Sequence, residues 1–171
     1  KHFYNLNTKK IETLLIHDAG ILFTKNGHQI FKNLNELKKK KYFQKIGLSI
    51  YNTDCLNYIT SNYDLDVVQC PYNIIDKKIL TTGWFDKLKK RGIETHVRSI
   101  FLQGLLVNRL IFKKPYFKKW QQEITDWFLW LDSNNVSPID YCLNDLLNCE
   151  CDKIIIGVNN YENLKEIIYF K

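Results

Sequence analysis

Short apolar runs recur along the chain, and a polar residue or a glycine follows each of them. The runs with their following residues are Leu14–Ile16 before His17, Ile46–Leu48 before Ser49, Val67–Val68 before Gln69, Thr95–Val97 before Arg98, and Ile154–Ile156 before Gly157. Segments with helical spacing lie between the runs. This alternation is typical of βα units around a parallel sheet. Because such folds bind ligands beyond the carboxyl ends of their strands, the residues after the runs are the first candidates for chemistry.

The same patterning predicts the extent of each element. We predict strands over residues 12–18, 45–50, 66–70, 94–99 and 152–157, the first of them buried. We predict helices over residues 27–40, 79–90, 115–131, 138–148 and 161–169, and a further helix after an expected cap at Asn52–Asp54. Ser137 and Pro138 fit the cap and the first position of the helix over 138–148, and Gly92 fits the end of the helix over 79–90. An open doubly wound sheet and an arc of a barrel both agree with this order.

Length and motifs narrow the class of protein. The chain has 171 residues, which fits one domain with a real core. It has no apolar run of the ~18 residues needed to cross a bilayer, and it shows no secretory signal pattern, so no membrane partner is expected. Neither G-x-G-x-x-G nor the phosphate-binding G-x-x-x-x-G-K-[ST] occurs, so a Rossmann or P-loop site is not supported.

The cysteines indicate a reducing compartment. There are five, an odd number, and no C-x-x-C pair occurs among them. Cys149 and Cys151 are too close together for an ordinary zinc site. We therefore expect free thiols, no metal and a cytoplasmic protein.

The basic residues offer two interpretations. The formal net charge is +7, and the basic residues form three clusters. The clusters are Lys38–Lys41; Lys87, Lys89, Lys90 and Arg91; and Lys113, Lys114, Lys118 and Lys119. Nucleic-acid binding is one interpretation. The first two clusters, however, fall at the ends of helical patterns, where cations complement the helix dipole. We favour solvated helix ends and expect no nucleic-acid partner.

The first residue of the sequence is not a methionine, which bears on whether the sequence is complete. The chain begins with Lys1 and contains no methionine. A complete, unprocessed translation product would start with methionine. We therefore expect this sequence to be a piece of a longer protein.

Five local strings resemble the aldo/keto reductase superfamily in their order and spacing. They are ETLLIHD at 12–18, KIGLSI at 45–50, VVQCPYNI at 67–74, VRSIFLQGLL at 97–106 and IIIGV at 154–158. The similarity extends over nearly the whole chain. Each string alone is weakly specific, and the five in register are much more so.

The resemblance implies a fold and a reaction. The family is a (β/α)8 barrel that reduces aldehydes and ketones with a nicotinamide cofactor. By resemblance, residues 1–171 are the C-terminal half of such a barrel, from just before its fourth strand to its end, as a partial barrel of five βα units. Of the family's catalytic Asp, Tyr, Lys and His, only the histidine has a counterpart, His17. An imidazole can orient and polarise a substrate carbonyl near neutral pH. The implied partner is a small carbonyl compound, and bacterial members that resemble this chain point to a sugar-related one.

The resemblance also places the nicotinamide end of a cofactor. Ser49 and Gln69 match positions that bond the nicotinamide carboxamide, a group that needs neutral donors and acceptors. The family often has Asn after the serine, and Ile50 stands there, so one amide contact is expected to be lost. Arg98 stands where many members place an aromatic ring on the nicotinamide, and a planar guanidinium can also stack on a ring.

The rest of the cofactor falls on two further segments. By resemblance, the loop that wraps the pyrophosphate comprises Ser99, Phe101, Leu102, Gln103 and Gly104. The adenosine side comprises Gly157, Val158, Asn159, Asn163 and Glu166. Asn163 stands where NADPH-preferring members carry Arg, so a bidentate phosphate partner is missing, and Lys165 is the alternative cation for that phosphate. NADP(H) is therefore expected only as the family default, and NAD(H) stays open.

A second interpretation is a binding or assembly module without enzymatic activity. An arc of five strands has two unpaired edges, which favour association with another copy or with the missing half. By the family resemblance, the piece alone lacks the tyrosine acid, so we expect it to be inactive in catalysis.

Overall fold

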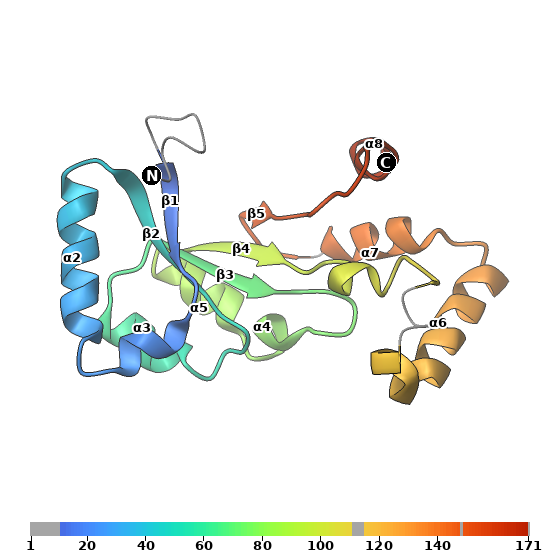
Figure 1. Ribbon diagram of the computed structural model, residues 1–171, viewed down its shortest axis with the longest axis horizontal. Coiled ribbons are helices and arrows are strands. Elements are labelled where there is room, and N and C mark those ends of the chain that lie inside the picture. Colours follow the sequence, from blue (N-terminus) through green and yellow to red (C-terminus); the bar gives the residue numbers. More distant parts are fainter. Residues whose placement is uncertain (1–10, 111–114, 148, 171) are drawn as a thin grey trace. The chain divides into compact units, whose positions relative to one another are not determined.

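The computed structural model describes residues 11–110, 115–147 and 149–170, and these residues form two compact units (Figure 1). Unit 1 comprises Lys1–Pro71, Lys78–Val97 and Cys151–Ile154, and the description of it starts at Ile11. Unit 2 comprises Tyr72–Lys77, Arg98–Glu150 and Ile155–Lys171, without the residues outside the described ranges.

Unit 1 is built on a five-stranded parallel sheet in the order β1-β2-β3-β4-β5. The strands are β1 (Ile11–Ile16), β2 (Phe43–Ser49), β3 (Val67–Pro71), β4 (Glu94–Arg98) and β5 (Lys153–Ile154). All five predicted strands are therefore confirmed, and their order along the sheet equals their order along the chain. Each neighbouring pair is joined by a crossover, as the alternation of strands and helices predicts.

Helices of unit 1 lie between the strands along the chain. They are the 3₁₀ helix η1 (Ala19–Phe23), α2 (Gly27–Lys39), α3 (Leu56–Asn62), α4 (Lys78–Thr81) and α5 (Trp84–Lys90). Two predictions are corrected. The expected helix over 79–90 is divided, because Gly83 adopts a left-handed φ of 67° between α4 and α5. Helix α3 is preceded by Cys55, while Asn52 accepts a hydrogen bond from the Asp54 backbone in a turn before it.

Gly92 ends α5 as predicted. Its φ is +71°, a conformation that costs glycine nothing and other residues about 1 kcal/mol. The Gly92 N–H donates to the Lys89 carbonyl, and the Ile93 N–H donates to the Leu88 carbonyl, both at 3.0 Å. These two bonds form a Schellman motif, which satisfies carbonyls that the helix end leaves open.

Side chains that skip strands show that the sheet is strongly curved. Lys45 on β2 lies 2.5 Å from Glu94 on β4, although β3 runs between them. Glu12 on β1 lies 2.8 Å from Lys153 on β5, the other outermost strand. In a flat sheet these two strands would be about 19 Å apart, at ~4.8 Å for each neighbouring pair. The sheet must therefore curl, as an arc of a barrel does.

The outermost strands are less buried than predicted. Strand β1 is only partly buried, although we predicted a buried strand. Strand β5 has two residues, not the predicted six, and the side chain of Ile154 is 44% exposed. The reason is the same for both, because among the described strands each has a neighbour on one side only. The inner strand β2, in contrast, keeps Ile46 and Leu48 fully buried.

Unit 2 has a helical core of its own. Its elements are the 3₁₀ helices η2 (Leu102–Gly104) and η4 (Pro115–Trp120), and the helices α6 (Gln121–Ser133), α7 (Pro138–Leu146) and α8 (Tyr161–Ile168). Ile124, Phe128 and Leu131 of α6 form the buried centre of the α6 packing. The Trp127 indole N–H donates to the Leu106 carbonyl at 3.0 Å, which ties α6 to the segment after β4.

A partly buried polar contact links α7 to the segment after β3. The Lys77 ammonium pairs with Asp145 and lies 4.4 Å from the centre of the Tyr72 ring. It also donates a 3.1 Å hydrogen bond to the Tyr72 hydroxyl. Tyr72 is 1% exposed, whereas the Lys77 and Asp145 side chains are 26% and 25% exposed, so the contact joins a buried ring to a partly exposed ion pair within unit 2.

Candidate functional site

Three of the predicted site residues lie side by side at one edge of the sheet in unit 1. Ser49 and Gln69 are partners in the register of β2 and β3, so their side chains are on the same face. Ile16 of β1 is partner to Leu48 of β2, and His17 and Ser49 follow these paired positions. At the level where β1 and β2 end, the three strands therefore carry an imidazole, a hydroxyl and an amide in sequence, and β3 continues for two residues beyond Gln69. We call His17, Ser49 and Gln69 the strand-end group.

The strand-end group has hydrogen-bonding capacity that the fold does not use. Within the described residues, none of the three side chains makes a hydrogen bond. The Gln69 backbone carbonyl accepts from Ile50 at 2.9 Å, which leaves the side-chain amide free. Ser49 is buried, and His17 is exposed. Neutral donors and acceptors held at the end of a rigid sheet suit a planar amide and a carbonyl oxygen.

A cavity of about 890 Å³ lies within unit 2, in the size range of small-molecule sites. Eight residues that the resemblance assigned to cofactor binding line it: Ser99, Phe101, Gln103, Gly104, Gly157, Asn159, Asn163 and Glu166. One wall is the segment after β4, and the other is the segment from Ile155 to Ile167. Leu110, the last lining residue of the first wall, and Ile155, the first of the second, are 45 positions apart in the sequence.

The loop that forms the first wall has an unusual backbone. Ser99, Leu102 and Gln103 have positive φ values of 62°, 46° and 56°, and Gly104 follows at 88°. Such values are uncommon for residues other than glycine, and they concentrate at binding sites. The folded unit holds this conformation in place at some cost in free energy.

Asn73 is one of the residues that hold the loop. It is buried, and its side-chain amide donates to the Ser99 carbonyl at 3.2 Å. Its side-chain oxygen accepts from the backbone of Ile75 and Asp76, at 3.0 and 2.9 Å. Asn73 therefore couples the turn after β3 to the start of the cavity loop. The sequence analysis gave Asn73 no role, although it lies in the VVQCPYNI string, because its contacts arise only in the fold.

The sequence interpretation missed Arg109, the cation that lines this cavity. Its guanidinium donates two hydrogen bonds to Asp132, at 3.0 and 2.5 Å, and lies 4.6 Å from the centre of the Phe128 ring. The signal was available, because Arg109 follows the Gly104 loop by five residues. Only the fold shows that it turns back to the cavity.

The beginning of α7 is a second feature that the sequence interpretation did not connect with binding. Ser137, Pro138 and Ile139 line the cavity. Ser137 caps the helix as predicted, accepting from the Asp140 backbone at 3.4 Å. The N-terminal end of a helix carries partial positive charge, which favours an anionic group nearby.

Three other predicted residues do not line the cavity. Leu102 and Val158 lie in the two walls along the chain, yet their side chains are not among the lining residues. Arg98 ends β4, where its guanidinium donates to the Ser99 hydroxyl at 3.1 Å and its carbonyl accepts from Tyr72 at 3.0 Å. These contacts hold the start of the loop.

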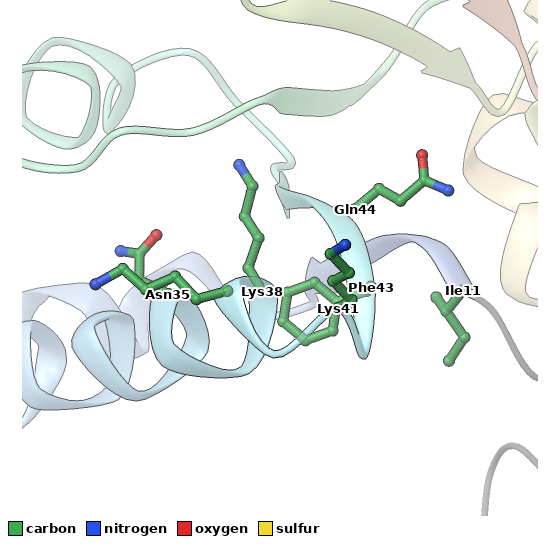
Figure 2. Close-up of a pocket in the computed structure, with 7 residues that line it drawn as sticks. Ile11, Asn35, Lys38, Lys41, Phe43 and Gln44 are labelled. Atoms are coloured by element: carbon green, nitrogen blue, oxygen red, sulfur yellow. The ribbon is translucent and has the colours of Figure 1, made fainter.

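A further cavity of about 600 Å³ lies at the other end of the strands in unit 1 (Figure 2). It is lined by the first residues of β1 and β2, Ile11 and Phe43, and by lysines at the end of α2. Lys38 there is paired with Asp66, at 2.6 Å to each carboxylate oxygen. These lysines complement the carbonyl end of α2, as the sequence predicts for this cluster.

No group of three or more potential metal ligands occurs among the described residues. The described cysteines are all free thiols. No helix in the described part of the chain is long and apolar enough to cross a membrane.

Comparison with known proteins gives matches at the level of structure. No protein-family model and no curated protein matches the sequence. The holo and apo forms of the aldo-keto reductase AKR11C1 from Bacillus halodurans each match 95% of this chain with a TM-score of 0.75, at 17% identity. The thermostable aldo-keto reductase Tm1743, in complex with the inhibitor epalrestat, matches 97% with a TM-score of 0.66, at 19% identity. The glycerol dehydrogenase AKR11B4 from Gluconobacter oxydans matches 97% with a TM-score of 0.60, at 14% identity.

These relatives are longer than the chain. It covers 56% of the length of AKR11C1 and of Tm1743, and 59% of AKR11B4. The five-stranded parallel sheet, its strand order and its curvature agree with an arc of such a barrel. The chain therefore has the fold of part of an aldo-keto reductase barrel.

Proposed function

We propose that this chain binds a nicotinamide dinucleotide and is the cofactor-binding part of a carbonyl reductase, its C-terminal half. One observation carries the proposal: eight residues assigned to the cofactor by sequence resemblance line a single cavity, although they come from two distant segments. Agreement in fold with aldo-keto reductases supports it.

The chemistry of the cavity fits the ADP part of such a cofactor. A pyrophosphate is anionic, and Arg109 and the start of α7 supply positive charge to the same cavity. In the loop from Ser99 to Gly104, the backbone N–H groups of Leu102 and Gly104 already donate to carbonyls of the loop itself. The N–H groups of Ser99 and Gln103 donate to no described residue, and their left-handed conformations suit the binding of a phosphate. Asn159, Asn163 and Glu166 offer polar groups for a ribose and a purine.

The strand-end group fits the other part of the chemistry. Ser49 and Gln69 can donate to and accept from a carboxamide, because the fold leaves both side chains unbonded within the described residues. His17 can donate a hydrogen bond to a substrate carbonyl oxygen and so polarise it. The cofactor, when bound, supplies the hydride. By the family resemblance, the proton for the oxygen comes from a tyrosine that has no counterpart in this chain.

Two ligands test the unit 2 cavity and the strand-end group separately. ADP-ribose contains the pyrophosphate and both riboses but no nicotinamide, whereas NADH contains all of them. We expect both to bind, measured by isothermal titration calorimetry. Arg109→Ala should weaken both by roughly tenfold, because it removes a charge-assisted hydrogen-bond donor. Arg91→Ala is the matched control, since Arg91 bonds the Thr60 carbonyl in unit 1 and does not line the cavity.

Variants of the strand-end group are measured with the same two ligands. Ser49→Ala and Gln69→Ala should weaken binding of NADH and leave binding of ADP-ribose unchanged. Failure of wild-type protein to bind either ligand would contradict the proposal. An equal loss for both ligands in the Gln69→Ala variant would show that Gln69 acts through the fold and not on the nicotinamide.

The chain by itself should not reduce carbonyl compounds. We expect no turnover with NADH or NADPH and a broad panel of aldehydes and ketones, followed by absorbance at the nicotinamide band. A rate above that of a His17→Ala control would show that residues of this chain suffice for the chemistry.

A further inference from the structure

The charge balance of the unit 2 cavity bears on which dinucleotide it takes. Arg109 is the one lysine or arginine among the described residues that line it. Asp132 already holds this guanidinium through two hydrogen bonds, so part of its charge is compensated. The cavity also contains a carboxylate, that of Glu166.

The two dinucleotides differ in what they require of such a cavity. NAD(H) brings one anionic group, the pyrophosphate, with a charge of about −2. NADP(H) adds a 2′-phosphate on the adenosine ribose, with a further charge of about −1.5 to −2 at neutral pH. A second anionic group requires a second cation, usually an arginine that bonds it through two N–H groups.

The wall formed by residues 155–167 does not provide this second cation. Its polar lining residues are Asn159, Asn163 and Glu166, which carry no positive charge. The Glu166 carboxylate has no hydrogen-bond or ion-pair partner among the described residues. A carboxylate accepts hydrogen bonds from ribose hydroxyls or from an adenine amine, and it repels a phosphate.

The Asn163 side chain is likewise free for a ligand. Its backbone N–H is used in capping α8, where it donates to the Asn160 side chain at 2.8 Å. No hydrogen bond of its side-chain amide to another described residue occurs. A neutral amide can pair with a hydroxyl, but it cannot neutralise a phosphate.

We infer that the cavity selects a dinucleotide without a 2′-phosphate, NAD(H) rather than NADP(H), through Glu166 and Asn163 on the adenosine side and Arg109 on the pyrophosphate. This inference rests on the proposed function, because it assigns the cofactor of the same cavity. It departs from NADP(H), which sequence resemblance gave only as a default. Among the described residues that line it, the cavity contains one cationic partner for an anionic group, Arg109, and one carboxylate that would repel a second, Glu166.

Binding measurements test the inference without any need for turnover. Wild-type protein is titrated with ADP-ribose and with its 2′-phosphorylated form, by calorimetry. We expect ADP-ribose to bind at least roughly tenfold more tightly. Asn163→Arg should reverse or abolish the preference, because it supplies the missing cation. Glu166→Gln should reduce it, because it removes the repulsion. Lys165→Gln is the control, since Lys165 lies on the same helix outside the cavity lining.

The outcomes separate the inference from the function on which it rests. Equal or tighter binding of the 2′-phosphorylated ligand by the wild-type protein would overturn the selectivity while it supports the proposed cavity. Binding of neither ligand would overturn both. Circular dichroism of each variant verifies that the protein is folded, so a changed ratio of affinities reports on recognition.

Discussion

At the scale of single residues, the sequence allowed the strand-end group to be selected, and the structure shows its arrangement. His17, Ser49 and Gln69 stand out because polar residues follow apolar runs, and register then places Ser49 beside Gln69. Arg109 could not be selected in the same way. Its significance depends on the return of the chain to residues 155–167, which no local pattern encodes. Local chemistry is therefore easier to predict than the convergence of distant segments.

The Cys142 thiol should be nearly unreactive in the folded protein. It is 1% exposed, and burial raises its pKa to about 12. At pH 8 roughly one thiol in ten thousand is then a thiolate, the reactive form. We expect iodoacetamide to modify the partly buried Cys151 well before the fully buried Cys142, measured by peptide mass spectrometry. In concentrated urea the two should react alike. Equal labelling of both thiols in native protein would contradict the packing of α7.

The tie between Tyr72 and Lys77 should make stability fall in alkaline solution. Burial raises the pKa of Tyr72, so its neutral form is favoured in the folded state. Burial acts to lower the pKa of Lys77, but hydrogen bonds to Asp145 and Tyr72 outweigh it, and that pKa is raised. Both contributions are complete below the unfolded pKa values, near 10 to 10.5, and are lost as the pH rises through the folded ones.

Urea unfolding between pH 7 and pH 11 measures this effect. The free energy of unfolding of wild-type protein should fall above about pH 10. The Tyr72→Phe variant should be less stable at pH 8, because Lys77 loses a partner, but should lose less stability on going to pH 11. If the free energies of unfolding of the two proteins fall in parallel with pH, Tyr72 does not contribute to the alkaline loss of stability.

At the scale of elements, the ends of helices were predicted better than the uninterrupted course of a helix or the length of a strand. Gly92 and the Ser137–Pro138 pair specify their helix ends locally, through one backbone conformation and one side-chain cap. The division between α4 and α5 at Gly83 was missed, because apolar spacing continues across it. The length of β5 was overestimated, because three consecutive isoleucines have strand propensity whether or not a neighbouring strand is present to pair with them.

The junction between η1 and α2 should not tolerate a side chain at Gly27. A Cβ at this position would lie 2.4 Å from the Leu22 carbonyl oxygen, a backbone atom that cannot rotate away. We expect Gly27→Ala to lower the free energy of unfolding by about 1–3 kcal/mol. Gly157→Ala is the matched control, because nothing lies within 4 Å of its Cβ. Urea titration followed by tryptophan fluorescence measures both variants. Equal stability of the two would contradict the close approach of α2 to η1.

At the scale of the whole molecule, βα alternation predicted a parallel sheet, and a family resemblance was needed to choose the barrel. The pattern specifies which segments are strands, but curvature arises from contacts between strands that are far apart in sequence. Lys45 with Glu94, and Glu12 with Lys153, are such contacts. The matches to aldo-keto reductase structures agree with that choice for the fold.

The outer strands should promote self-association. Among the described strands, β1 and β5 each have one neighbour, and unpaired strand edges attract other strands. We expect sedimentation velocity to show a larger species that grows with protein concentration. Ile154→Lys, at the β5 edge and 44% exposed, should reduce it by placing a charge there. Leu129→Lys, on α6 and 57% exposed, should not. A monomer at every concentration would contradict the expectation.

The contact between Glu12 and Lys153 also affects when the sheet can fold during synthesis. The two residues are separated by 141 positions, so the whole segment between them must leave the ribosome before they can meet. Until then β1 can pair with β2, which follows soon after it, but the curl that brings the outer strands together is not yet fixed. A curl that is fixed by so distant a contact is expected to form late and slowly, because loop closure over a long stretch precedes the stabilising interaction.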